Sequence, residues 1–202
     1  MTSALGRDDS RAWQRMLSGR RLNLLDPSPL DVEIEDIAVG LVRVARWNGQ
    51  TSGDWAFSVA QHCLLVEDLL ARFREDPPIS WRRLALLHDA PEYVIGDLIT
   101  PFKNALSKDY REIEQRLMQA IRQRFSLTKL PKAADMLIKR ADRAAAYIEA
   151  IKIAGFPPSE ARPVFDPKGR FASFELDAIE LLPEPPNEAE RRYLERFHAL
   201  SG

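Results

Sequence analysis

Residues 58–73 read SVAQHCLLVEDLLARF, and they form the clearest helical pattern in the chain. Ser58 and Gln61 have the S-x-x-Q spacing of a capping box, in which each side chain bonds the backbone N–H of the other residue, so we expect the helix to begin at Ser58. Apolar residues then follow at the three- and four-residue spacing of a buried helix face. This face includes a histidine, and its members are Val59, His62, Cys63, Val66, Leu69, Leu70 and Phe73.

A second histidine is expected on an inward helix face at position 88. Ser80 can cap this helix, whose inward face reads Trp81, Leu84, Ala85 and His88. Pro91 lacks an N–H donor and clashes with the preceding turn, so it should end or kink the helix. The pattern therefore predicts His88 and Asp89 at the broken end of a helix.

A third helix, expected from Pro131 to about Ala154, has Asp142 at the border of its apolar face. Three helices thus each turn an unusual polar side chain toward the interior. Because an unpaired buried carboxylate is costly, these groups need a common partner. Imidazoles and carboxylates are good ligands for a divalent first-row metal, and two His with two Asp leave positions open for water and substrate.

A structural alternative stays open for each of these residues. A histidine on an apolar face is often a hydrogen-bonded core residue. Asp142 can instead form an ion pair with Arg140 or Arg143. The remaining histidine, His198, has no acidic or metal-ligating neighbour, and we expect it on the surface or in side-chain packing.

The rest of the chain carries weaker patterns. Residues 21–25 resemble a short strand before the turn-forming sequence DPSP at 26–29. We expect amphipathic helices at about 35–45, 107–125 and 187–200, the last capped by Asn187 with Glu190 at its third position. Residues 156–186 carry half of the fourteen prolines and should be irregular, with a short strand around 171–174.

Composition excludes several classes of protein. The chain has 202 residues, 45% of them apolar and 29% charged, which is typical of one folded domain. Its net charge of −1 and lack of unopposed basic clusters argue against nucleic-acid binding. The single cysteine, Cys63, excludes an intramolecular disulfide and fits a reducing compartment. With no signal peptide and no membrane span visible, we expect a cytoplasmic protein without a membrane partner.

Three segments resemble a known family: SVAQHCLLVEDLL (58–70), ALLHDAPEYVIGDLITPFK (85–103) and IKRADRAAAYIEA (138–150). With Arg46-Trp47 ahead of the first histidine, they resemble the HD-domain superfamily of metal-dependent phosphohydrolases, and within it the bacterial 5′-deoxynucleotidase branch. The resemblance, which spans about residues 35–155, implies an all-α HD-domain helical bundle. The residue patterns outside that span add minor short strands in the N-terminal and 156–186 regions. Chain length and this match together predict a single domain, 1–202, with its core at about 35–155, an N-terminal extension at 1–34, and an irregular segment plus helix at 156–202.

The resemblance also implies roles for individual residues. The metal ligands would be His62, His88, Asp89 and Asp142, holding one divalent ion, with Mn²⁺, Co²⁺ or Fe²⁺ favoured and Zn²⁺ or Mg²⁺ possible. Glu92 and Asp97 would be the catalytic carboxylates. The expected substrate-binding residues are Arg46 for the phosphate, Trp47 for the sugar or base, and Thr100 and Lys103 along the pocket. The alternatives are a surface ion pair for Arg46 and, equally favoured, a core position for Trp47. For Thr100 and Lys103 a helix cap and a solvated lysine are the plainer interpretations.

The activity implied is release of phosphate from (deoxy)nucleoside 5′-monophosphates, so the expected partner is a small-molecule nucleotide. One alternative keeps the site but changes the substrate to a nucleoside triphosphate, a cyclic nucleotide or a guanosine polyphosphate. Another is a non-catalytic helical module that holds a structural metal. A homodimer also remains open. The chain departs from the family pattern at Gln61, where a glutamate is common.

Overall fold

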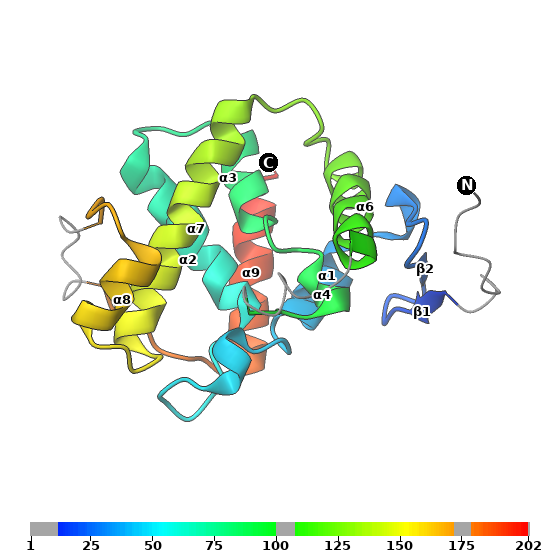
Figure 1. The fold of residues 1–202 in the computed structure, drawn as a ribbon. Helices are drawn as coiled ribbons and strands as arrows, with labels where there is room; N and C mark the ends of the chain where they lie inside the picture. The colour runs from blue at the N-terminus through cyan, green and yellow to red at the C-terminus, as the bar shows by residue number, and fades with distance from the viewer. Residues whose placement is uncertain (1–11, 100–107, 172–178, 202) are drawn as a thin grey trace.

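The computed structural model describes residues 12–99, 108–171 and 179–201, which fold mainly into helices (Figure 1). Two short 3₁₀ helices among these residues are η2 (Pro29–Asp31) and η3 (Arg46–Gly49). The expected all-α class is confirmed. The other elements are β1 (Trp13–Arg15), β2 (Arg21–Asn23), α1 (Ile34–Leu41), α2 (Val59–Phe73), α3 (Ile79–Leu86), α4 (Glu92–Ile95), α6 (Lys108–Arg124), α7 (Lys132–Lys152), α8 (Pro158–Phe165) and α9 (Pro186–Ala199).

Helix α2 has the start and the buried face that its sequence predicts. The Ser58 Oγ accepts a hydrogen bond from the Gln61 backbone N–H at 3.3 Å, and Gln61 Oε1 accepts one from the Ser58 N–H at 3.4 Å. The apolar face packs against α7, α3 and α9 (Figure 1). His62 lies in this face without solvent exposure. Packing of α2 therefore brings His62 into the interior beside α7 and α3.

His88 and Asp89 lie in the turns between α3 and α4. Helix α3 ends at Leu86 and Pro91 precedes α4, as the proline predicts. The hydroxyl of Tyr193 on α9 donates a hydrogen bond to the Leu86 carbonyl at 3.0 Å. This buried bond holds Leu86, the last residue of α3, in place just before the turn that carries His88.

The predictions that Ser80 and Asn187 cap their helices are wrong. Helix α3 begins at Ile79 with Pro78 as its N-cap, and α9 begins at Pro186 with Pro185 as its N-cap. In both helices the carbonyl of the capping proline accepts first-turn N–H bonds. Ser80 and Asn187 therefore lie inside the first turn, beyond the position from which a side chain caps its own helix.

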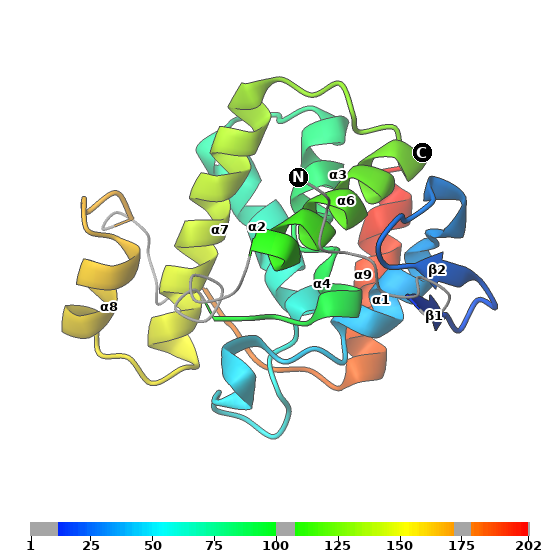
Figure 2. The same ribbon diagram turned by 45° about the vertical axis from the view of Figure 1, so that its right-hand side comes forward.

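The segment 156–186 contains a helix where the sequence predicted irregular structure. Helix α8 packs against α7 at the left of Figure 2. Pro157 is its N-cap and Pro158 its first residue, positions that suit proline because no N–H partner is needed there. These prolines begin a helix instead of preventing one. Of the strand expected at 171–174, only Phe171 is described, and it lies in a turn.

The N-terminal strand at Arg21–Asn23 is confirmed, and its partner was not foreseen. β1 and β2 pair antiparallel with Gln14 opposite Leu22, whose side chain is fully buried. Figures 1 and 2 show this hairpin beside α1, on the side of the molecule away from α8. Among the described residues, no helix combines the length and apolarity needed to cross a bilayer.

Candidate metal centre

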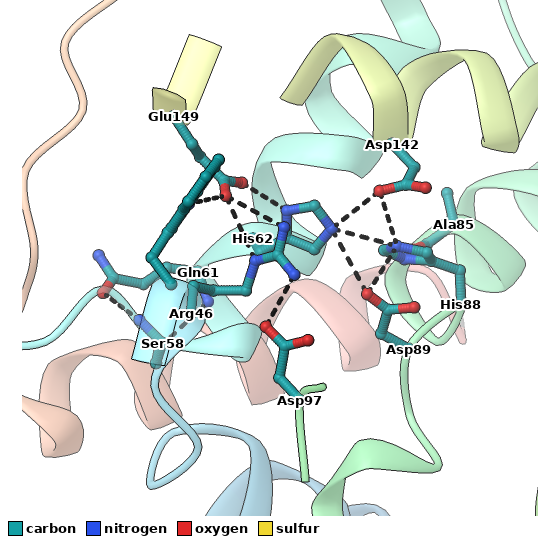
Figure 3. Close-up of polar contacts among 11 residues, drawn as sticks. Arg46, Ser58, Gln61, His62, Ala85, His88, Asp89, Asp97, Asp142 and Glu149 are labelled. Carbon is teal, nitrogen blue, oxygen red and sulfur yellow. Dashed lines mark hydrogen bonds and ion pairs between the residues drawn. The ribbon is translucent and has the colours of Figure 1, made fainter. Parts of the chain in front are cut away.

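Two imidazoles meet where α2 packs on the end of α3. His62 comes from α2 and His88 from the turn after α3, and their Nε2 atoms are 3.3 Å apart (Figure 3). Their side chains are 0% and 11% exposed, respectively. The third histidine, His198, is exposed on α9, as expected.

Two carboxylates approach the same pair of nitrogens. Asp89 Oδ2 lies 3.5 Å from His62 Nε2 and 3.2 Å from His88 Nε2. Asp142 Oδ1, from α7, lies 3.3 Å and 3.9 Å from these nitrogens. Ligand atoms of His62, His88 and Asp89 all lie within 4.8 Å of one another, close enough to hold a metal ion. All four residues expected as ligands are therefore brought together.

The alternative ion pairs for Asp142 do not form among the described residues. Arg140 lies over the ring of Phe73, with its guanidinium carbon 4.2 Å from the ring centroid. No ion pair joins Asp142 to Arg140 or Arg143 in this part of the chain. The Asp142 side chain is 42% exposed and points toward the two imidazoles (Figure 3).

The outer nitrogens of both rings have acceptors that determine which ring nitrogen carries the proton. His62 Nδ1 lies 2.5 Å from Glu149 Oε1, and His88 Nδ1 lies 2.8 Å from the Ala85 carbonyl oxygen. Neutral imidazoles held in this way donate from Nδ1 and keep the Nε2 lone pair. Two such nitrogens at 3.3 Å can both point inward only with a cation between or beside them, a proton in the metal-free site or a metal ion when one is bound. The donor set therefore fits a divalent metal.

The charges around the imidazoles also favour a cation. Burial and Arg46 lower the pKa of His62, but Glu149 and Asp142 outweigh them and raise it to about 9. Burial lowers the pKa of His88, but Asp89 raises it well above its usual value. Burial raises the pKa of Asp89, but His88 lowers it further, so this carboxyl is ionised. The site thus stabilises positive charge at the Nε2 atoms.

Arg46 lies next to the metal centre because the preceding helix ends early. The helix expected to reach Ala45 stops at Leu41, and Ala45 forms a β-bridge with Ser58 at the start of α2. The Arg46 guanidinium donates to Asp97 Oδ2 at 2.9 Å and to Glu149 Oε2 at 3.2 and 3.3 Å. Although burial lowers the pKa of Arg46, these carboxylates raise it, so the guanidinium stays charged.

Trp47 is half-buried and packs against two aromatic side chains, and its expected contact with the sugar or base stays a prediction. Its ring centroid lies 5.7 Å from those of Phe156 and Phe165. Its indole Nε1 donates to Glu149 Oε2 at 2.9 Å. The ring therefore joins an aromatic cluster at the end of α7 and α8, while its polar edge faces the site.

Glu149 is the site residue that the sequence analysis missed. It is fully buried on α7 and contacts His62, Arg46 and Trp47. Burial raises the pKa of Glu149, but Arg46 and His62 lower it to about 2. One signal was available: Glu149 follows Asp142 by seven residues, two turns along the same helix face.

A pocket of about 700 Å³ opens beside the metal centre. Its walls include His88, Asp89 and Glu92 on one side and the polar face of α6 on the other. Glu92 is 2% exposed at the first turn of α4. Thr100 and Lys103, expected along the pocket, lie outside the described residues.

Comparison with known proteins agrees with this geometry. The chain is 52% identical over 191 residues to an uncharacterized protein of Rhodobacter capsulatus, an alignment that covers 94% of this chain and 96% of that protein. Residues 41–155, which contain His62, His88, Asp89 and Asp142, match the model of the YfbR-like 5′-deoxynucleotidase family. The matched segment spans more than half of the chain and encloses the whole cluster. The protein therefore belongs to the YfbR-like 5′-deoxynucleotidase family of the HD-domain superfamily.

Proposed function

We propose that this protein is a metal-dependent phosphohydrolase that releases phosphate from (deoxy)nucleoside 5′-monophosphates. The observation that carries the proposal is the convergence of His62, His88, Asp89 and Asp142 beside a pocket of about 700 Å³. That volume lies in the range of about 300–1,000 Å³ typical of small-molecule sites. The activity in the name of the matching family supports the choice of substrate.

The four converging side chains would hold one divalent ion. When bound, such an ion acts as a Lewis acid that activates water and polarises the phosphoryl group. Imidazole and carboxylate ligands favour Mn²⁺, Co²⁺ or Fe²⁺, and Zn²⁺ and Mg²⁺ remain to be tested beside them. His62 and His88 are oriented for this role by Glu149 and the Ala85 carbonyl.

Arg46 is assigned to the substrate phosphate. A guanidinium has five N–H donors. Within residues 12–99, 108–171 and 179–201, three of them are used in the bonds to Asp97 and Glu149, and we assign the other two to a ligand. Two donors on one planar group suit the non-bridging oxygens of a phosphate. Because its carboxylate partners hold the guanidinium in place, Arg46 needs little reorganisation when substrate binds.

Glu92 and Asp97 are assigned to proton transfer. Glu92 lines the same pocket as the ligands His88 and Asp89, so it can accept a proton from the attacking water. Asp97 is held 2.9 Å from Arg46, near the expected phosphate position. It either donates a proton to the leaving 5′-oxygen or helps to place the water.

The test is metal analysis followed by phosphate release from a nucleotide panel. The full chain, stripped of metal and reloaded with Mn²⁺ or Co²⁺, should release phosphate from nucleoside 5′-monophosphates. The panel should include triphosphates, cyclic nucleotides and guanosine polyphosphates, because preference for one of these would replace the proposed substrate. Stoichiometric metal without turnover of any nucleotide would indicate a structural metal site and refute the enzymatic function.

A further inference from the structure

Glu149 has one carboxylate oxygen on each half of the site. Oε1 lies 2.5 Å from His62 Nδ1, on the side of the metal centre. Oε2 accepts from Trp47 Nε1 at 2.9 Å and from the Arg46 guanidinium at 3.2 and 3.3 Å. The side chain is fully buried, so these protein groups take the place of water around the carboxylate (Figure 3).

The Oε1 contact determines which ring nitrogen of His62 carries the proton and which one faces the metal centre. Because a carboxylate can only accept, Nδ1 must be the donor, and the Nε2 lone pair faces Asp89, Asp142 and His88. Carboxylates that hold a metal-ligating histidine in this way typically raise both its basicity and the metal affinity of the site.

The Oε2 contacts reach a backbone segment that has an unfavourable conformation. Trp47 and Asn48 both have positive φ, at 57° and 52°, in the left-handed region that non-glycine residues rarely adopt. Such conformations persist only where surrounding contacts impose them. The side chains of Arg46 and Trp47 both bond Oε2, so Glu149 holds this segment beside the metal centre together with Asp97 and the rings packed on Trp47.

We propose that Glu149 is a positioning residue that couples the metal centre to the phosphate-binding segment, by orienting His62 with one oxygen and Arg46-Trp47 with the other. This inference rests on the proposed function, since it assigns His62 to the metal and Arg46 to the substrate. It adds a residue seven positions after Asp142 that touches neither the substrate nor the metal.

The substitution Glu149→Gln separates the two contacts. An amide has one oxygen and one NH₂ group, so it cannot accept on both sides. If the oxygen faces His62, the NH₂ group meets the donors of Trp47 and Arg46. If the NH₂ group faces His62, Nδ1 becomes the acceptor and Nε2 carries the proton, which removes the lone pair from the metal side. Either arrangement disturbs one half of the site.

Glu67 provides a matched control. It is equally buried and lies on α2, five residues after His62. Its carboxylate also accepts from arginines, Arg82 and Arg196, but its contacts lie with α3 and α9 and not with the metal centre. Glu67→Gln therefore removes a similarly buried charge without touching the site.

The experiment compares Mn²⁺ binding by isothermal titration calorimetry to the metal-stripped full chain, together with kcat and KM for phosphate release. We expect Glu149→Gln to weaken Mn²⁺ binding about 10- to 100-fold, the range known for such outer carboxylates, and to raise KM. Glu67→Gln should lower thermal stability and leave Mn²⁺ affinity unchanged. Glu149→Asp keeps the charge but is one methylene shorter, so its Mn²⁺ affinity should be intermediate, which provides a test even if Glu149→Gln folds poorly.

Three outcomes separate this inference from the proposed function. Unchanged Mn²⁺ affinity and KM in Glu149→Gln would overturn the positioning role while leaving the enzyme assignment intact. Equal losses of affinity in Glu149→Gln and Glu67→Gln would also overturn it, because they would indicate a general loss of packing. A wild-type chain that binds no Mn²⁺ and releases no phosphate would instead contradict the proposed function.

Discussion

The close approach of α1 and α4 gives a prediction whose size can be worked out from distances. Gly40 lies in α1, and a Cβ added to it would lie 2.7 Å from Tyr93 Cβ, 2.9 Å from Tyr93 O and 3.0 Å from Tyr93 Cα. Non-bonded carbons are normally about 3.5–4.0 Å apart, so the helices must separate by about 1 Å in Gly40→Ala. The atoms that clash belong to the backbone and Cβ of Tyr93, which cannot rotate out of the way.

Two opposing effects decide the stability of Gly40→Ala. In a helix, alanine is favoured over glycine by about 0.8–1.0 kcal/mol. Overpacking typically costs about 1–3 kcal/mol, and a clash with backbone belongs near the upper end of that range. We therefore expect net destabilisation of about 1–2 kcal/mol, measured as the free energy of unfolding in urea.

The same substitution should also affect turnover. Tyr93 follows Glu92 directly in α4, so a shift of α4 displaces a proposed catalytic carboxylate. A misplacement of about 1 Å can reduce a rate about 100-fold. Glu35→Ala, at an exposed position of α1, is the control and should change stability by less than about 0.5 kcal/mol. A Gly40→Ala protein as stable as the wild type, or destabilised with full kcat, would refute the reasoning.

Further predictions concern the metal and the surface charges. Chelation should lower the melting temperature, which differential scanning fluorimetry can measure. Mn²⁺ at about 100 times its Kd should raise the free energy of unfolding of the metal-free protein by about 2.7 kcal/mol and restore the melting temperature. A melting temperature that responds to neither treatment would argue against a bound metal. Asp142→Ala should lose metal-dependent phosphate release while circular dichroism still shows a folded helical protein, and an active, metal-replete variant would contradict the ligand assignment. Hydrogen bonds from Arg20 and Arg124 lower the pKa of Glu33 below its ordinary value of about 4.5, so its stabilising effect is present above that pH and is lost as the pH falls through the lowered value. The free energy of unfolding of Glu33→Gln should therefore be lower than that of the wild type by up to about 1 kcal/mol at pH 7, and this difference should shrink as the pH is lowered. The same difference at pH 3 would exclude the ionic cause.

Local sequence signals were reliable where the deciding contacts are themselves local. The capping box at Ser58 joins residues three positions apart, and Pro91 acts on its own helix turn. The two errors in helix capping have one shared cause. At Pro78 and Pro185, the proline supplies the helix N-cap through its carbonyl, and a nearby Ser or Asn was taken for the cap.

For the site, helix periodicity predicted that His62, His88 and Asp142 lie on or beside apolar faces, and it did not single out Glu149. Only the tertiary structure decided which of them touch. Glu149 contacts His62 across 87 residues and Arg46 across 103 residues of chain, distances over which no periodicity carries information. These contacts exist because α2, α7 and the segment after α1 bury their apolar faces against one another, and packing of whole elements determines where their polar groups meet.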